Sequence, residues 1–264
     1  MEIKDIKTKS NYYPIIFFIA MLAIWEILSR AGMFPAFILP APSRIIISLI
    51  TGFTSMSFHI LITLYEAFAG FIIAIVLSFL VAVLMDSLYG FKKTVYPLLI
   101  ISQTIPIIIL APLFVIWFGY GYKPKLVIVV LICFFPVTIS LLQSLSSVDR
   151  DLIDLMRSMG ASRLQIYKYV KLPASLNGFF SGLKIAATYS IMGATIGEWV
   201  GGKDGLGVYM IRAKQSFATD RVFAAILVIT VLSILLLKLI ELIERKSMPW
   251  KVTLQKEYIY NNDN

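Results

Sequence analysis

Cysteine, histidine and charged side chains are all scarce in this sequence of 264 residues. Because Cys133 is the only cysteine, the chain has no disulfide within itself. Because His59 is the only histidine, a histidine-based metal site is not expected. Charged residues make up 15% of the chain, whereas soluble domains carry about a quarter. A membrane-bound enzyme would need a cluster of histidine, cysteine or acidic residues, so this composition disfavours that class.

Hydrophobic residues are correspondingly abundant, at 59% of the chain, and the mean hydropathy is +0.85. One soluble core cannot hide so much apolar surface, so lipid is the expected solvent. The formal net charge is +9, which on a soluble protein would suggest a nucleic-acid partner. On a membrane protein it is better explained by basic residues kept on the cytoplasmic side, and no nucleic-acid partner is expected.

A transmembrane helix needs about 20 mostly apolar residues. The apolar run from Tyr12 follows Lys4, Lys7 and Lys9 and so imitates a secretory signal, but Glu26 and Arg30 follow it in place of small cleavage-site residues. It is therefore interpreted as an uncleaved first span. The sequence predicts about six spans, interrupted by Pro106, Pro112 and Pro136, at roughly 12–30, 59–85, 96–118, 125–145, 176–199 and 222–243.

The distribution of lysine and arginine sets the expected orientation. With a cytoplasmic N-terminus, more basic residues fall in cytoplasmic segments than in outer ones, so both termini are predicted to be cytoplasmic. The outer segment 31–58 is proline-rich, and from Ser43-Arg44 an amphipathic stretch is expected to lie along the membrane surface. The cytoplasmic loop 146–175 is the longest on its side. The predicted fold is therefore an all-α membrane protein of one domain, residues 1–264.

The loop 146–175 carries a helical pattern on both sides of Gly160-Ala161-Ser162. Before this corner, apolar residues recur at helical spacing up to Met159, and after it they recur from Leu164. Ser162 is a candidate N-cap for the second helix, and Pro173 is expected to end that helix. The pattern alone fits two alternatives equally, namely a knuckle inserted into a partner's cleft and a helix pair lying on the membrane with snorkelling basic side chains.

This loop resembles the EAA loop of the permeases of ABC importers, which reads Glu-Ala-Ala, three residues, Gly, nine residues, then Ile-x-Leu-Pro. Gly160 takes the glycine position, and Val170, Leu172 and Pro173 take the last positions at the same spacing. Asp154-Leu155-Met156 departs from the Glu-Ala-Ala triplet, although Asp154 keeps the acid. The resemblance implies that the ATPase contacts lie at Asp154, Met159, Gly160, Ala161, Ser162, Leu172 and Pro173.

Further motifs extend the resemblance over nearly the whole chain, in the order seen in the nitrate/sulfonate/taurine branch of these permeases. They are Leu39-Pro40-Ala41-Pro42, Thr63-Leu64, Gly70-Phe71, Pro112-Leu113 with Trp117-Phe118-Gly119, Phe135-Pro136 and Gly205-Leu206-Gly207.

The family implies a type I ABC-importer permease fold in a bacterial inner membrane, with a permease core at about 59–245 and an extra N-terminal span at 12–30. Its members are homodimers that work with cytoplasmic ATP-binding subunits and an extracytoplasmic solute-binding protein. ATP and Mg²⁺ would be bound by those ATPase subunits, and no cofactor is expected in this chain.

One stretch imitates a phosphate-binding loop, because Gly197, Gly202 and Lys203 match most of the required spacing. The match is rejected because Asp204 replaces the hydroxyl residue after the lysine and no βαβ pattern surrounds it. The chain therefore needs an external motor.

Acidic and basic residues inside predicted spans are functional candidates by default. Glu66, Lys184 and Glu198 are such residues, and Glu66 and Glu198 are hypothesised to line the outer part of a substrate pathway. The alternative is snorkelling or pairing between helices. His59, at the outer end of the second span, is expected to be structural.

Two transport mechanisms compete. An ion-gradient-driven secondary transporter would favour paired acids near the membrane midplane and internal repeats, and neither is evident, so an ATP-driven importer is the favoured interpretation. For the substrate, Tyr65-Glu66-Ala67 and Gly197-Glu198-Trp199 resemble relatives associated with thiamine-precursor pyrimidines. Sulfonate, taurine and nitrate are the next candidates for the substrate.

Overall fold

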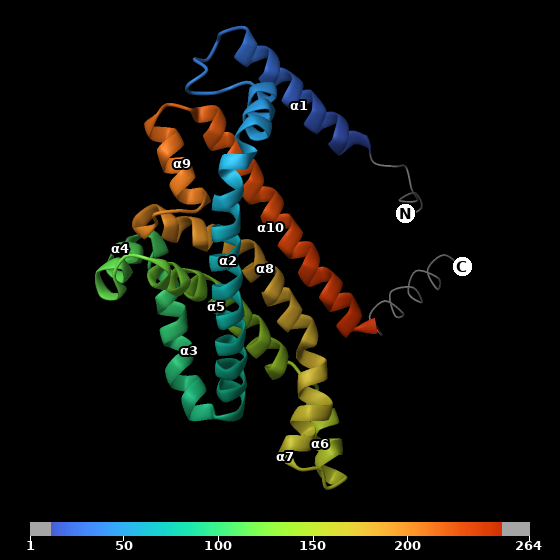
Figure 1. The fold of residues 1–264 in the computed structure, drawn as a ribbon. Helices are drawn as coiled ribbons and strands as arrows, with labels where there is room; N and C mark the ends of the chain where they lie inside the picture. The colour runs from blue at the N-terminus through green and yellow to red at the C-terminus, as the bar shows by residue number, and fades with distance from the viewer. Residues whose placement is uncertain (1–11, 250–264) are drawn as a thin grey trace. The chain divides into compact units, whose positions relative to one another are not determined.

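The computed structural model describes residues 12–249, and every regular element in this range is a helix (Figure 1). Two segments lie outside the described residues. They are the segment before Tyr12, which holds the basic residues Lys4, Lys7 and Lys9, and the residues after Pro249. The described range divides into two compact units. The first comprises the residues up to Ser57 together with Tyr209–Leu227, and the second comprises Phe58–Val208 and the residues from Val228.

The first unit contains α1 (Tyr12–Arg30), which matches the first predicted span and has no buried residue. Its end is tied to the start of α2 through one carboxylate. Glu26 accepts hydrogen bonds from the Ser43 backbone N–H at 3.0 Å and hydroxyl at 2.7 Å, and it pairs with Arg30 at 2.5 Å. The two residues that argued against a cleavage site therefore fix how the chain enters α2.

Helix α2 (Pro42–Ser87) is 46 residues long, or about 69 Å, and contributes to both units. The sequence predicted a surface helix from Ser43 and a separate span at 59–85. That separation is wrong, because no proline or glycine pair interrupts the run and the helix continues through both segments. Helix α10 (Thr219–Ser247) likewise covers the predicted span 222–243 and extends beyond it.

The predicted third span, 96–118, is broken into two helices, α3 (Tyr89–Thr104) and α4 (Ile107–Phe118), which meet at 102°. The break lies at Ile105 and Pro106, where both residues are extended. The ring of a proline disfavours helical backbone in the residue before it, which explains the position of the break. Pro112 lies inside α4 without ending it. The bent pair is either one broken span or a re-entrant loop.

Helices α5 (Tyr122–Ser146) and α8 (Leu172–Gly201) pack antiparallel along a seam of small residues in the second unit. A Cβ added at Gly182 would lie 2.8 Å from the Pro136 carbonyl oxygen, and one at Gly197 would lie 3.0 Å from the Lys125 Cα. Small residues spaced four apart let two membrane helices approach closely. The seam is made by Gly178, Gly182, Gly193 and Gly197.

This seam explains why α8 lacks the hydropathy of a typical span. Four described helices are long and apolar enough to cross a membrane, or up to five if the bent pair counts as one, and α8 is not among them. Its glycines, serines and the charged Lys184 and Glu198 lower its hydropathy, although its 30 residues are long enough to span. The predicted number of six spans and the cytoplasmic location of both termini therefore stay predictions.

Candidate functional site

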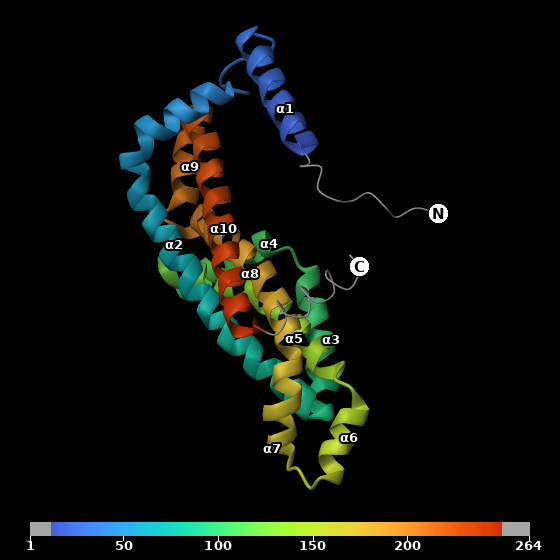
Figure 2. The same cartoon turned by 90° about the vertical axis from the view of Figure 1, so that its right-hand side faces the viewer.

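The loop between α5 and α8 forms two short helices, α6 (Arg150–Ser158) and α7 (Arg163–Ile166), that project beyond the ends of α5 and α8 (Figure 2). Helix α6 ends at Ser158 with Met159 as its C-cap, and Gly160 follows with a φ of +80°. A left-handed residue at this position lets Ala161 N–H bond back to the Met156 carbonyl at 3.0 Å. The predicted break at Gly160 is confirmed, and the positive φ there favours glycine.

Helix α7 begins with a reciprocal cap. The Ser162 hydroxyl accepts from the Gln165 N–H at 3.3 Å, and the Gln165 side chain accepts from the Ser162 N–H at 2.7 Å. Such a capping box satisfies two N–H groups that the first helical turn leaves free. The predicted N-cap at Ser162 is confirmed, and the cap makes the Gly160–Ser162 corner a defined structure.

The expectation that Pro173 ends the second helix is wrong. Helix α7 passes into a π-helical turn, Tyr167–Lys171, and then directly into α8, with Pro173 at its start. In this turn the Leu172 N–H bonds to the Tyr167 carbonyl, five residues back. The wider turn and the position at a helix start accommodate a residue without an N–H. The loop 146–175, the predicted coupling loop, is therefore continuous with α8.

The outer surface of the loop is apolar at its corner. The side chains of Met159 and Leu164 flank Gly160-Ala161 and are 75% and 78% exposed. Asp154, the acid of the divergent triplet, is also exposed and pairs with Arg157 at 2.9 Å within α6. An exposed ion pair of this kind contributes little stability, so Asp154 is available to a partner. Leu172 is half-buried and Pro173 exposed at the base of the loop.

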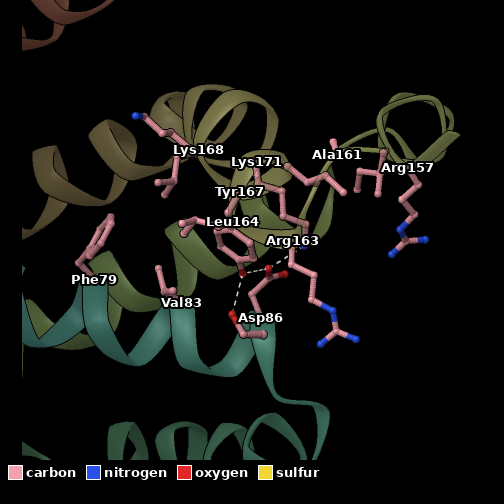
Figure 3. A pocket seen from close by; sticks show the side chains of 14 residues that line it. Phe79, Val83, Asp86, Arg157, Ala161, Arg163, Leu164, Tyr167, Lys168 and Lys171 are labelled. Carbon is pink, nitrogen blue, oxygen red and sulfur yellow. Dashed lines mark hydrogen bonds and ion pairs between the residues drawn. The ribbon is translucent and has the colours of Figure 1, made fainter. Parts of the chain in front are cut away.

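A buried carboxylate attaches the loop to the end of α2. Asp86 accepts from the Tyr167 hydroxyl and from the Lys171 ammonium, the latter at 2.6 Å (Figure 3). Burial, and in second place the hydrogen bond to Asp86, raise the pKa of the Tyr167 hydroxyl above its ordinary value of 10.0. The phenol therefore stays a donor to Asp86 at physiological pH. The coupling loop is thus held to both α8 and α2.

The predicted pathway residues Glu66 and Glu198 lie together in a second polar site, Glu66 near the middle of α2 and Glu198 near the C-terminal end of α8. Glu66 is 3% exposed and Glu198 is 1% exposed. Glu66 pairs at 2.6 Å with Lys125 of α5, which is itself buried. Glu198 accepts from the Thr63 hydroxyl at 2.6 Å. Both acids are thus engaged in interhelical contacts within one chain, and their role in a pathway stays a prediction.

The acid–lysine network, defined as His59, Thr63, Glu66, Lys125 and Glu198, binds the backbone of Gly205-Leu206-Gly207, the turn into helix α9 (Leu206–Gln215). The N–H groups of these three residues donate in order to His59 Nδ1 at 3.0 Å, Thr63 Oγ1 at 2.9 Å and Glu198 Oε2 at 2.6 Å. A Cβ at Gly205, where φ is +119°, would lie 2.1 Å from the Glu198 carboxyl. The turn therefore requires glycine to approach the acid.

The network has an imbalance of charge. It contains two carboxyls, of Glu66 and Glu198, and one ammonium, of Lys125, which also donates to the Asp204 carbonyl at 3.3 Å. Among the described residues, the Glu66 Oε2 atom has no hydrogen-bond partner. An unpaired buried charge is costly, so an excess carboxylate must be offset by a proton or by the N–H groups of the turn.

Lys125 was not among the candidate site residues predicted from the sequence. The available signal was its position at the first residue of the predicted span 125–145. Lys184, the third predicted pathway residue, is not part of this network. It pairs with Glu244 of α10 and is 31% exposed at its side chain. The structure thus joins Glu66 with Glu198 and leaves Lys184 elsewhere.

Comparisons with known proteins agree with this architecture. The family described as binding-protein-dependent transport system inner membrane component matches residues 74–248. The formylaminopyrimidine transport permease protein ThiX of Halalkalibacterium halodurans is 38% identical over 90% of this chain and 95% of its own length. The putative aliphatic sulfonates transport permease protein SsuC of Bacillus subtilis is 28% identical over 88% of this chain and 84% of its own.

Among solved structures, a crystal structure of an amino acid ABC transporter superimposes with a TM-score of 0.63. The alignment covers 76% of this chain and 97% of that chain, at 16% identity. At this identity the likeness shows a common fold.

Proposed function

Because the chain belongs to the family of inner-membrane components of binding-protein-dependent transport systems, and is thus the permease component of an ABC importer, we propose that it moves a small polar solute across the bacterial inner membrane, driven by a separate ATPase. In this assembly two copies of the chain pair, with both termini in the cytoplasm. ATP and Mg²⁺ are bound by the cytoplasmic ATPase subunits, and an extracytoplasmic binding protein delivers the solute.

The observation that carries the proposal is the corner at Gly160. Its positive φ makes a sharp bend, exposed apolar side chains flank it, and a Cβ added there would meet nothing within 4 Å inside the chain. A surface that is apolar, rigid and empty on its outer side suits insertion into a cleft of a partner protein. The alternative, a helix pair resting on lipid, does not require a sharp glycine corner.

The same loop is suited to pass on motion. Its second half continues into α8 through the π-helical turn, and Asp86 bonds its base to α2. Closure of an ATPase dimer would therefore move α8 and α2 together with the loop. The energy of the change comes from the different affinity of ATP for the two states of the motor.

Replacing Gly160 at the corner by glutamate tests whether this loop docks onto the ATPase. Gly160→Glu places a charged side chain in the proposed docking cleft, and we expect loss of both ATPase co-purification and uptake, with membrane insertion unchanged. Gly160→Asn distinguishes a loss of docking from a misfolded loop. Asparagine tolerates a positive φ, so this variant should fold normally while its side chain still weakens docking.

Gly90→Glu is the matched control. Gly90 is exposed near the start of α3 and also has open space at its Cβ, but it lies outside the loop. Its uptake should equal that of the unaltered chain. Normal uptake in Gly160→Glu, with the ATPase still bound, would overturn motor docking at this loop.

For the substrate, the proposal favours a thiamine-precursor pyrimidine. Its support is the 38% identity to a formylaminopyrimidine permease. The predicted acidic pathway of Glu66 and Glu198 would also suit an aminopyrimidine better than an anion. Sulfonate, taurine and nitrate rank next. Competition of labelled aminopyrimidine uptake by unlabelled pyrimidine, but not by taurine or nitrate, is the expected result. Uptake of labelled taurine together with no uptake of labelled aminopyrimidine would exclude the pyrimidine.

A further inference from the structure

The acid–lysine network contains two carboxyls and one ammonium, and its histidine does not make up the difference. His59 Nδ1 accepts a backbone N–H of the turn at 3.0 Å. An imidazolium has no acceptor nitrogen, so this bond requires the neutral form of His59. In the adjoining turn, Lys203 is exposed and Asp204 faces Lys125 through its carbonyl oxygen. Among the described residues, the ammonium that pairs with these buried carboxyls is therefore that of Lys125.

Three of the four carboxyl oxygens in the network have a donor. Glu66 Oε1 accepts from the Lys125 ammonium at 2.6 Å. Glu198 Oε1 accepts from the Thr63 hydroxyl and Glu198 Oε2 from the Gly207 N–H, each at 2.6 Å. The fourth oxygen, Glu66 Oε2, is buried and has no donor among the described residues. The missing donor therefore belongs at one atom of Glu66.

The nearest group that could supply this donor is the other acid. The carboxyls of Glu66 and Glu198 lie within hydrogen-bond reach of each other. Two ionised carboxyls are acceptors only, so they cannot bond to each other. A protonated carboxyl, by contrast, is a donor to its ionised neighbour. One proton at this pair would satisfy the unpaired oxygen and remove the excess charge at the same time.

We propose that Glu66 and Glu198 form a proton-binding site, which holds one proton between the two carboxyls while the turn at Gly205-Leu206-Gly207 is in place. A single negative charge then faces Lys125. Like charges at such a distance in a buried site do not both ionise, which is why paired carboxyls share a proton. The proton belongs to the pair rather than to either acid. The inference depends on neither the transported substrate nor motor docking.

A metal cation fits this place less well than a proton. The Lys125 ammonium lies 2.6 Å from Glu66 and would repel a second cation beside it. A hard metal ion also takes about six oxygen ligands. The Thr63 hydroxyl is already used, because it bonds to Glu198 and accepts from the Leu206 N–H at 2.9 Å. A proton needs only one oxygen from each carboxyl.

The shared proton also stabilises the turn into α9. Thr63 holds the Leu206 N–H, and Glu198 holds the Gly207 N–H. With the proton bound, Glu198 can stay beside Glu66 and keep its contacts with the turn. Without it, two negative charges would occupy one buried site, and their repulsion would move Glu198 away from Gly207.

Infrared spectroscopy of the purified full-length permease tests for this proton. At about pH 7 exposed acids are ionised, so the carbonyl stretch of a protonated carboxyl reports a buried acid. The unaltered chain should show this band. Glu66→Gln and Glu198→Gln should each remove it, because the remaining acid then pairs one to one with Lys125. Glu244→Gln is the matched control and should leave the band in place, since Glu244 is 7% exposed but already paired with Lys184.

The pH dependence of folding counts the proton. An unfolded glutamate is ionised above about pH 4.3. A proton that the folded chain keeps and the unfolded chain loses makes the folding equilibrium constant decrease as pH rises. The ratio of this constant in the unaltered chain to that in Glu66→Gln should therefore fall about tenfold per pH unit between about pH 5 and pH 7. The corresponding ratio for Glu244→Gln should stay constant.

Replacing sodium by choline in the buffer should change neither measurement. A carboxyl band that survives both Glu66→Gln and Glu198→Gln would overturn the proposal, and so would a ratio for Glu66→Gln that does not depend on pH. A band that appears only after sodium is removed would assign the site to a sodium ion and overturn the proposal as well.

Discussion

Replacing Lys125 by methionine tests the charge count of the buried network. The ion pair joins Lys125 to Glu66 at 2.6 Å, and the two side chains are only 5% and 4% exposed. Methionine keeps an unbranched side chain of similar length but removes the single ammonium. Two buried carboxyls, of Glu66 and Glu198, would then share a site without a counter-ion. The structure would have to protonate them or admit water.

The expected magnitudes are unequal because the network has two acids and one base. Removing one partner of a buried pair costs about 3–5 kcal/mol, which is the expected loss for Lys125→Met. Glu66→Gln should cost only about 1 kcal/mol, since Glu198 remains as a counter-charge for Lys125 and the amide oxygen still accepts. The double variant removes both charges, so it should be more stable than Lys125→Met alone, by about 2 kcal/mol.

The assay is reversible unfolding of the purified permease in mixed micelles, followed by tryptophan fluorescence. Lys123→Met is the matched control, because Lys123 lies on the same helix two residues earlier and is exposed. It should change stability by less than about 0.5 kcal/mol. Equal decreases in the free energy of unfolding for Lys125→Met and Glu66→Gln would refute the assignment of two acids and one base to the network. A double variant no more stable than Lys125→Met would refute the pairing.

Three further variants test other features. Gly182→Ala should destabilise by about 1–3 kcal/mol through overpacking against the Pro136 backbone, whereas Gly90→Ala, with open space, should be neutral or slightly stabilising in the same unfolding assay. Ser162→Ala should cost about 1 kcal/mol locally and speed hydrogen exchange in the first turn of α7. Because the folded pKa of Tyr167 is raised, the stability that its hydroxyl contributes is present below pH 10 and lost as pH rises through the raised value. The difference in phenolate absorbance between the unaltered chain and Tyr167→Phe should show that one tyrosine titrating above the ordinary pKa.

Local features of the coupling loop were predictable from sequence because they depend on neighbours in the chain. The bend at Gly160 needs a left-handed residue, and the cap at Ser162 needs a hydroxyl three residues before Gln165. Pro173 was misjudged for a physical reason. Proline forbids an internal N–H bond, but it is tolerated at a helix start after a π-helical turn, and spacing alone does not reveal that turn.

The burial of Lys125 could not be predicted in the same way. Its partner Glu66 is 59 residues away, and hydropathy does not tell which faces of two helices meet. The glycine seam of α8 was missed because a hydropathy scan treats glycine as a weakly apolar residue. Its importance is steric, and it becomes evident only when Gly182 is seen against the backbone of α5. What remained hidden were contacts distant in sequence, and these determine both polar sites.

These contacts also indicate which part of the second unit moves as one body. Glu66 and Asp86 lie on α2 twenty residues apart, or about 30 Å, so one helix joins the acid–lysine network to the coupling loop across the thickness of a membrane. Helix α8 also joins the network to the coupling loop, because it contains Glu198 near one end and continues from the loop at the other. The glycine seam opposes sliding between α5 and α8, because any shift would bring side chains into backbone. By contrast, α3 has no buried residue and meets α4 at a bend of 102°. Because α3 packs only partly buried side chains against α2 and α5, we expect the bend between α3 and α4 to change most when α2, α5 and α8 tilt together.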